Sequence, residues 1–216
     1  MGFPVPSLPP MYADLHNLTG RPKGIQMSGP RDRMVASAAL LIRERGAHST
    51  AISDVLEHSG APRGSAYHYF PGGRTQLLCE AVDFASDHIA RRLSTAATAV
   101  DALDTLVGDF RLQLTESGYR AGCPVVAVAV EADNPPVIER AAAAFSRWTG
   151  LIGDLLRSDG LAATRATELA VLCTTAIEGA VLVARTAGDT AALDLVHRQL
   201  RALVSAATGE RNSDDD

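Results

Sequence analysis

One short stretch of the sequence concentrates side chains that can bind an anionic polymer. Arg63, Tyr67 and His68 can donate hydrogen bonds to phosphates or to base edges. Ser65 adds a hydroxyl, and Gly64 lets the backbone approach another molecule closely. An arginine in this setting can pair with both acceptors of a guanine in the major groove. These residue types predict contact with nucleic acid, although a solvated arginine at a helix start is the simpler alternative for Arg63.

Two flanking residues can add phosphate contacts. Thr50 stands before one predicted helix and Arg74 stands at the start of another. The first turn of a helix has unbonded N–H groups and the positive end of the helix dipole, which together favour a phosphate. We therefore include Thr50 and Arg74 in the predicted DNA-binding set.

Two short helices and a tight turn must position these residues. Val55 and Leu56 belong to the apolar stripe of the first helix, which we expect Ser53 to cap. Gly60 supplies the turn because glycine accepts positive φ without a steric penalty. Pro62 suits the first turn of the second helix.

The second helix has one outward and one inward side. Its outward residues are the hydrogen-bonding ones named above, whereas Ala66, Tyr69 and Phe70 are expected to face largely inward. A helix, a glycine turn and a second helix with basic and small residues near its start form a helix-turn-helix motif, here residues 51–70.

The spaced pattern across residues 31–95 resembles the N-terminal domain of the TetR family of transcriptional regulators. The residues that carry the resemblance are Ala38, Leu41, Ile42, Gly46, Thr50, Ile52, Gly60, Gly64, Tyr67, Tyr69, Phe70 and Leu77. Residues 61–74, with Pro71-Gly72-Gly73 before Arg74, are most similar to the LmrA/YxaF-like subgroup. The resemblance implies that the Tyr67 hydroxyl and the Arg74 side chain bind phosphates.

The charge of the chain is unevenly distributed. The 216 residues carry a net charge of −5, which alone argues against a nucleic-acid partner. Residues 21–74, however, hold eight Lys or Arg against four Asp or Glu, a net charge of +4, so the remainder carries −9. A positive end on a negative body can steer that end toward phosphates.

Composition and periodicity predict an all-α protein. Apolar residues make up 46% of the chain and aromatic residues only 5%, which favours helices over sheets. We expect about nine helices in an N-terminal DNA-binding domain (29–75) and a C-terminal ligand-binding and dimerisation domain (76–208), between a disordered arm (1–28) and tail (209–216). The arm either is dispensable, with Met27 as the true start, or brings Arg21 and Lys23 to DNA. The helices expected after the helix-turn-helix are 74–93, 100–117, 125–132, 135–157, 163–187 and 190–208.

Residues 166–184 leave little polar surface on their helix. A helix that is apolar nearly all round must be buried on more than one side. In a body of this size, a second copy of the chain is a plausible cover, and Leu193, Leu200 and Leu203 give the last helix an apolar stripe beside it. We therefore predict a homodimer through the last two long helices, as the family resemblance also implies.

Effector binding must come from the body, where pockets are mostly apolar with a few polar groups. Glu178 stands out because a carboxylate within an apolar helix needs a partner, which a ligand amine, an arginine or a second subunit could provide. Plain core packing is the alternative for each candidate. The candidates for a small-molecule effector are Phe84, His88, Phe110, Tyr119, Phe145, Trp148 and Glu178.

Cysteine and acidic residues do not suggest a cofactor. Cys79, Cys123 and Cys173 are far apart, which suits a reducing cytoplasm and offers neither a disulfide framework nor a metal cage. Cys123 is either a buried inert thiol or a redox or effector contact. Asp54 and His58 are four residues apart, but two ligands rarely make a metal site.

No stretch approaches the ~20 apolar residues of a membrane span, and the N-terminus lacks a signal sequence. We therefore predict a cytoplasmic, nucleoid-associated homodimer that binds operator DNA and answers to a small hydrophobic effector. A helical enzyme would need an acid–base pair, a nucleophile or a metal set, and the sequence offers none, so no catalytic residue is predicted. A protein that binds ligands but not DNA is the remaining alternative.

Overall fold

The structure is a computed structural model that describes residues 29–131 and 133–209. Within these residues it contains nine α-helices and no strand, as the sequence predicts. The arm predicted for residues 1–28 and the tail beyond Gly209 lie outside the described residues. The helices are α2 (Pro30–Arg45), α3 (Ile52–Ser59), α4 (Ser65–Tyr69), α5 (Gly73–Ser94), α6 (Ala99–Glu116), α7 (Pro124–Glu131), α8 (Pro135–Ser158), α9 (Ala163–Ala187) and α10 (Ala191–Gly209).

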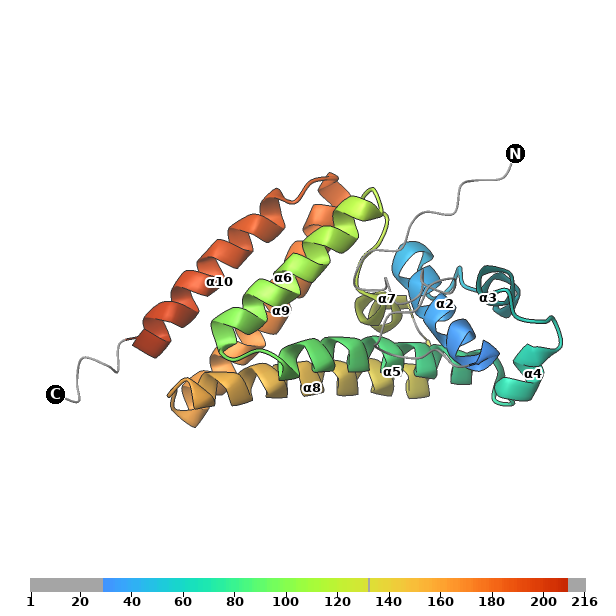
Figure 1. The fold of residues 1–216 in the computed structure, drawn as a ribbon, viewed down its shortest axis with the longest axis horizontal. Coiled ribbons are helices and arrows are strands. Elements are labelled where there is room, and N and C mark those ends of the chain that lie inside the picture. The colour runs from blue at the N-terminus through green and yellow to red at the C-terminus, as the bar shows by residue number, and fades with distance from the viewer. Residues whose placement is uncertain (1–28, 132, 210–216) are drawn as a thin grey trace.

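The molecule is elongated, with a small head at one end and a larger body behind it (Figure 1). Helices α2, α3 and α4 form the head, and α4 lies at its outer end. Helices α5 and α8 lie side by side along the long axis, and α5 runs from the head into the body. Helices α6, α9 and α10 pack on one another in the body.

The first helix of the head is delimited by residues with defined backbone roles. Pro30 begins α2, where a missing N–H costs nothing. Gly46 ends the helix with a φ of 88°, which other residues rarely adopt. A side chain at this position would also collide with the Glu131 carboxylate of α7. The end of α2 is therefore shaped by its contact with the body.

The start of α3 differs from the prediction. Ser53 does not cap the helix; instead the Ala51 N–H donates to Asp54 Oδ2 over 3.0 Å. A carboxylate three residues into a helix can reach back in this way to an orphan N–H group. Gly60 ends α3 in the left-handed conformation, with φ 64° and ψ 20°, as its place in the turn predicts.

The second helix of the motif is shorter than predicted. Pro62 lies in the turn before α4 and not in its first turn, because the helix begins only at Ser65. The Ser65 N–H and hydroxyl both donate to the Pro62 carbonyl, over 2.9 Å and 2.7 Å. Phe70 follows the helix and is buried, whereas Tyr69 is only partly buried against the core. Pro71 and Gly72 then separate α4 from α5.

One hydrophobic core runs from the head into the body. Among the described helices, α9 is the one that is long and apolar enough to cross a membrane by length and composition alone. That finding corrects the expectation that no stretch approaches such a span. Its most apolar window has a mean hydropathy of 1.6 and is 44% buried inside the fold, because α8 and α10 pack against it.

Candidate nucleic-acid interface and effector pocket

The outer side of the head presents the residues that the sequence predicts to meet DNA. Tyr67 on α4 is 80% exposed, the largest apolar side chain to be so open, and His68 beside it is exposed. Arg63 and Gly64 are exposed in the turn that leads into α4. Within the described residues, the Arg63 guanidinium and the Tyr67 hydroxyl have no hydrogen-bond partner, so both are available to a ligand outside the chain.

Ser65 is less available than its neighbours. It is partly buried, and its hydroxyl donates to the Pro62 carbonyl. The oxygen still has lone pairs but no spare proton in this arrangement. Its backbone N–H is used in the same turn. Ser65 therefore supports the start of α4 and can offer DNA only an acceptor.

Thr50 and Arg74 are hydrogen-bonded to each other, but both are engaged by the protein's own backbone and do not form an open phosphate site. Thr50 is 3% exposed, and its hydroxyl donates to the Gly46 carbonyl over 2.8 Å. Arg74 donates from Nε to the Thr50 carbonyl over 3.2 Å and from Nη2 to the Ala47 carbonyl. The two residues thus connect the start of α5 to the loop between α2 and α3, and Arg74 is an exposed residue.

Arg31 is a basic residue of this surface that the sequence analysis did not single out. Its guanidinium carbon lies 5.6 Å from the centre of the Phe70 ring, and its Nη2 bonds Glu80 Oε1 over 2.7 Å. The pairing is with α5, so Arg31 orients α2 against the helix that leads to the body. The sequence did offer a signal for this residue, because a basic side chain on the first turn of the predicted first helix lies in the basic part of the chain.

The head is bonded to the body at the carboxyl end of α2. The Arg43 carbonyl accepts from the Gly122 N–H over 2.9 Å, and the Glu44 carbonyl accepts from Arg185 Nη2 over 3.0 Å. The last carbonyls of a helix have no partner within it, so these two donors from the body complete α2. We call the four residues Arg43, Glu44, Gly122 and Arg185 the junction.

A pocket lies between α5, α6, α8 and α9. The space open to the centre of a water-sized molecule is about 20 Å³, which holds roughly one water. A ligand of ordinary size therefore requires the four helices to move apart. The lining residues are Ile89, Leu106, Phe110, Trp148, Ile152, Thr174, Ile177 and Glu178.

Three of the seven effector candidates line this pocket, namely Phe110, Trp148 and Glu178. Phe145 is not part of the lining but packs edge-on against Trp148, with ring centres 5.5 Å apart.

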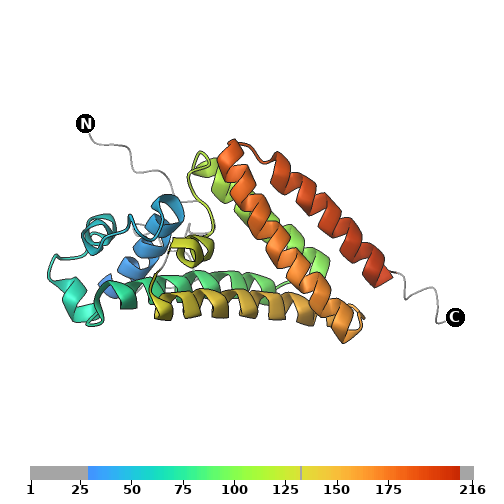
Figure 2. The same cartoon turned by 180° about the vertical axis from the view of Figure 1, so that it is seen from behind.

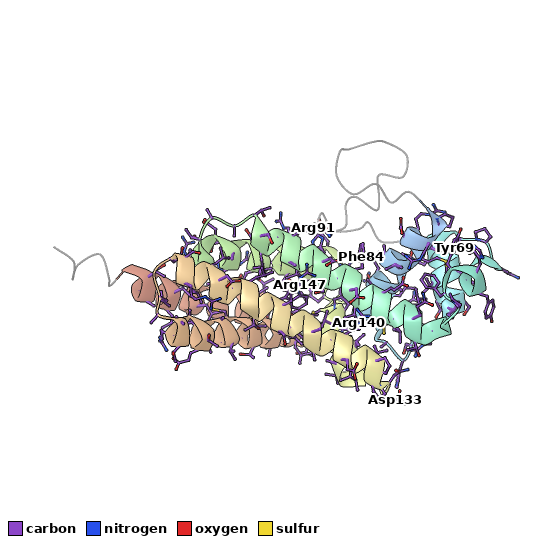
Figure 3. The ribbon with its side chains drawn as sticks, turned by 90° about the horizontal axis from the view of Figure 1, so that it is seen from below. Tyr69, Phe84, Arg91, Asp133, Arg140 and Arg147 are labelled. Atoms are coloured by element: carbon purple, nitrogen blue, oxygen red, sulfur yellow. The ribbon has the colours of Figure 1, made fainter. Side chains whose placement is uncertain are left out.

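The other three candidates are not part of the lining. Figure 3 shows Phe84 on α5 beside the α8 residues Arg140 and Arg147. His88 is on the same helix as Phe84 and is also outside the lining, while Tyr119 lies in the loop after α6. Aromatic residues could be chosen as effector candidates from the sequence by their type. The aliphatic lining residues could not, because which of many such residues face the pocket depends on how four helices pack.

Glu178 is the ionisable residue of the pocket. Its Oε2 atom is shielded from solvent and accepts no hydrogen bond from the described residues. The Cys123 thiol is a neighbour of this carboxylate. Burial raises the pKa of Glu178 to about 7, and burial also raises the pKa of Cys123 well above its usual range. A buried thiol with a raised pKa stays neutral, so we predict that Cys123 is unreactive.

Helices α9 and α10 lie beside each other at the end of the body away from the head (Figure 2), and both carry exposed apolar side chains. Val171, Leu172, Leu182 and Val183 on α9 are each between 44% and 52% exposed, and Leu195 on α10 is 51% exposed. An apolar face that continues over several helical turns is typical of a protein–protein interface. We call these five residues the α9–α10 face.

Acidic and thiol groups do not gather into a metal-binding set among the described residues. Asp54 caps α3 through the Ala51 N–H, so it is already occupied. His58 is an exposed residue whose ring is partly desolvated by its neighbours, which lowers its pKa.

Comparison with known proteins identifies both parts of the chain. Residues 35–81 match the family model of bacterial regulatory proteins of the tetR family. Residues 99–199 match the C-terminal domain of LmrA/YxaF-like transcriptional regulators. These two models cover the head with the start of α5 and most of the body.

Individual relatives agree with these matches. The uncharacterized HTH-type transcriptional regulator Rv0196 of Mycobacterium tuberculosis is 58% identical over 193 residues, covering 86% of this chain and all of the relative. The HTH-type transcriptional regulator LmrA of Bacillus subtilis is 27% identical over 169 residues, covering 76% and 90%. A crystal structure of a TetR transcriptional regulator from Chloroflexus aurantiacus superposes with a TM-score of 0.64 at 26% identity, covering 82% and 94%.

The names of these relatives and the family models describe transcriptional regulators and not enzymes. An exposed helix-turn-helix on a helical body, matched by both family models and by a 58% identical relative, leads to one assignment: the chain belongs to the tetR family of bacterial transcriptional regulators, with a body of the LmrA/YxaF-like type.

Proposed function

We propose that the protein is a homodimeric repressor that binds a near-palindromic operator and leaves it when a small apolar effector enters the body. The observation that carries this proposal is the separation of two sites along one helix. Arg63 and Tyr67 lie at the outer end of the head and make no hydrogen bond to any described residue, whereas the pocket lies in the body. Helix α5 bonds the head through Arg74 and lines the pocket through Ile89.

The DNA-binding surface proposed here consists of Arg63, Gly64, Tyr67 and His68, with Arg74 beside them. Each α4 would enter a major groove, and two copies would reach successive grooves about 34 Å apart. Thr50 and Ser65 act mainly by holding this surface in place, because their hydroxyls donate within the head. On this proposal, residues 29–75 form the DNA-binding domain and residues 76–208 form the ligand-binding and dimerisation domain.

Dimerisation would use the α9–α10 face. Two copies related by a two-fold axis would pair four helices and cover the exposed leucines and valines. Gly179 lies in the middle of this stretch of α9, with nothing within 4 Å of where a Cβ would be, so a partner helix can approach closely there. A dimer of this kind fits a protein of the bacterial cytoplasm that works on the nucleoid.

Helix α5 provides the mechanical connection. Arg74 bonds the head and Ile89 lines the pocket, and fifteen residues of helix separate them by about 22 Å. An effector that forces the pocket open would tilt α5 and change the spacing of the two heads. The effector must bind this spread state better than the DNA-binding state, and a coupling of about 1–3 kcal/mol is typical.

The experiment is a selection of bound duplexes from random DNA, together with binding to the promoter that flanks the gene. The proposal predicts a paired motif and an affinity that falls steeply with salt, because each phosphate contact releases counterions. Failure to enrich any sequence, with no salt-sensitive binding to the promoter, would contradict it.

A further inference from the structure

The polar groups of the pocket are already used, with one exception. The Trp148 indole N–H donates to the Ser86 carbonyl over 3.1 Å. The Thr174 hydroxyl donates to the Ala170 carbonyl and accepts from the Thr149 hydroxyl, both over 3.0 Å. Neither residue has a proton left to offer a ligand.

Glu178 is the exception. The Cys123 thiol neighbours its carboxylate, and Oε2 is shielded from solvent and accepts no hydrogen bond from the described residues. A buried acceptor without a donor is unfavourable, so a ligand that supplies a donor gains a hydrogen bond without having to displace an existing one. The pKa of Glu178 is raised to about 7 because burial removes water from the charged carboxylate and the protein does not replace all of the lost hydrogen bonds.

The rest of the lining is apolar. Aliphatic side chains from α5, α6, α8 and α9 surround the space, and the Phe110 and Trp148 rings add flat aromatic surface. Such a wall favours a compact aromatic or aliphatic body and rejects a ligand with several polar groups, since those groups would be desolvated without partners.

We propose that the pocket selects apolar ligands that carry a single hydrogen-bond donor, either a hydroxyl or a protonated nitrogen, and that this donor binds Glu178 Oε2. The inference rests on the effector function proposed above and specifies the class of ligand. Selectivity follows from an asymmetry: a ligand with a donor satisfies Oε2, whereas the same ligand without one leaves it buried and unpaired.

The test compares three probes of similar shape, namely toluene, benzyl alcohol and benzylamine. Binding to the full-length protein is followed by the fluorescence of Trp148, the single tryptophan of the chain, which lines the pocket. The measurement is made at about pH 8, where benzylamine is protonated. DNA release is measured separately with the same probes.

The wild type should bind benzyl alcohol and benzylamine about tenfold more tightly than toluene. Glu178→Met, which keeps the length of the side chain but has no acceptor, should abolish that preference. Glu178→Gln, which keeps an acceptor and loses the charge, should retain the preference for benzyl alcohol and lose the advantage of benzylamine. The Glu178→Gln variant also provides the test on its own if the Glu178→Met variant does not fold.

Equal or tighter binding of toluene by the wild type, no binding of any probe, or an unchanged preference in both variants would overturn the inference. Failure of the proposed effector function would give a different result from failure of this inference. A probe that binds with the expected preference but does not release DNA would contradict the effector mechanism and leave the ligand class intact.

Discussion

Arg185 on α9 donates to the Glu44 carbonyl on α2 over 3.0 Å. The two residues are 141 positions apart, and their hydrogen bond joins the body to the last turn of the first helix of the head. Because the Arg43 carbonyl accepts from Gly122 beside it, the junction bonds consecutive carbonyls of α2 to two separate parts of the body. A change in α9 or in the loop before α7 therefore acts directly on the head.

The junction makes a prediction for local stability. Removing the Arg185 donor leaves a carbonyl at the end of α2 without its partner, and hydrogen bonds from charged donors contribute about 1.5–3 kcal/mol. Arg185→Ala should therefore speed amide exchange at the carboxyl end of α2 by at least roughly tenfold in hydrogen-exchange mass spectrometry. Arg165→Ala, on the exposed start of α9 where Arg165 pairs with Glu168, is the matched control. Equal exchange in both variants would show that the junction does not hold the head.

The pocket carboxyl predicts a pH dependence of stability. The pKa of Glu178 is raised from 4.5 to about 7 in the folded protein, so the folded state holds this proton more tightly than the unfolded state. Stability from this group is present below about pH 4.5 and is lost as the pH rises to about 7, by roughly 3 kcal/mol. The neighbouring Cys123 thiol stays neutral over this range, because burial raises its pKa.

Urea unfolding at several pH values tests this prediction. Glu178→Gln is neutral at every pH, so it should remove the loss of stability between about pH 5 and pH 8. Glu116→Gln, at the exposed end of α6, should keep it. A wild-type stability that does not change over this range would show that the Glu178 carboxyl is better solvated than the structure indicates.

The α9–α10 face predicts the oligomeric state. Leu182→Glu places a charge on a side chain that is 52% exposed in the single chain and that would be covered in the dimer. Burying a charge without a partner is costly, so the dimer dissociation constant should rise at least about 100-fold, as measured by sedimentation equilibrium. Val130→Glu is the control, since Val130 on α7 is apolar and 80% exposed but lies away from this face. Equal weakening by both variants, or a monomeric wild type, would contradict the proposed interface.

The cysteines predict an order of reactivity. Cys79 is partly exposed, whereas Cys123 and Cys173 are buried, and burial raises the pKa of Cys173 to about 11. A thiol reacts as its thiolate, so a thiol-specific disulfide reagent should label Cys79 first and the other two only after unfolding. Fast labelling of Cys123 in the native protein would restore the redox alternative for that residue.

Helix positions were largely predictable because strong local signals mark them. The bounds of α9 agree with the prediction at both ends, and those of α5 and α8 agree within one residue. Pro135 begins α8, Gly188 follows α9, and each of the three helices has its own apolar periodicity, so no distant contact is needed to recognise them. The prediction that Ser53 caps α3 was wrong. Ser53 and Asp54 are both residue types that cap helices, and only the folded geometry shows that Asp54 accepts the hydrogen bond.

The candidate site was less predictable where it depends on packing. The exposure of Tyr67 follows from its place on α4, whereas the burial of Thr50 depends on how the loop after α2 folds back on Gly46. Similarly, Trp148 could be selected by its type, but Ile89 joins the pocket only because α5 and α8 lie side by side. The junction involves a backbone N–H and two carbonyls, which have no signature in a sequence.

The central claim is that the exposed edge of α4 reads DNA, and its most direct test is the affinity of variants for an operator selected in vitro. Arg63→Ala should weaken binding by about 1–3 kcal/mol, and Tyr67→Phe should weaken it through the loss of one phosphate contact. Arg91→Ala, an exposed arginine at the far end of α5 (Figure 3), should leave the affinity unchanged. If the Arg63 and Tyr67 variants bind the operator as tightly as the Arg91 variant does, α4 is not the DNA-reading element.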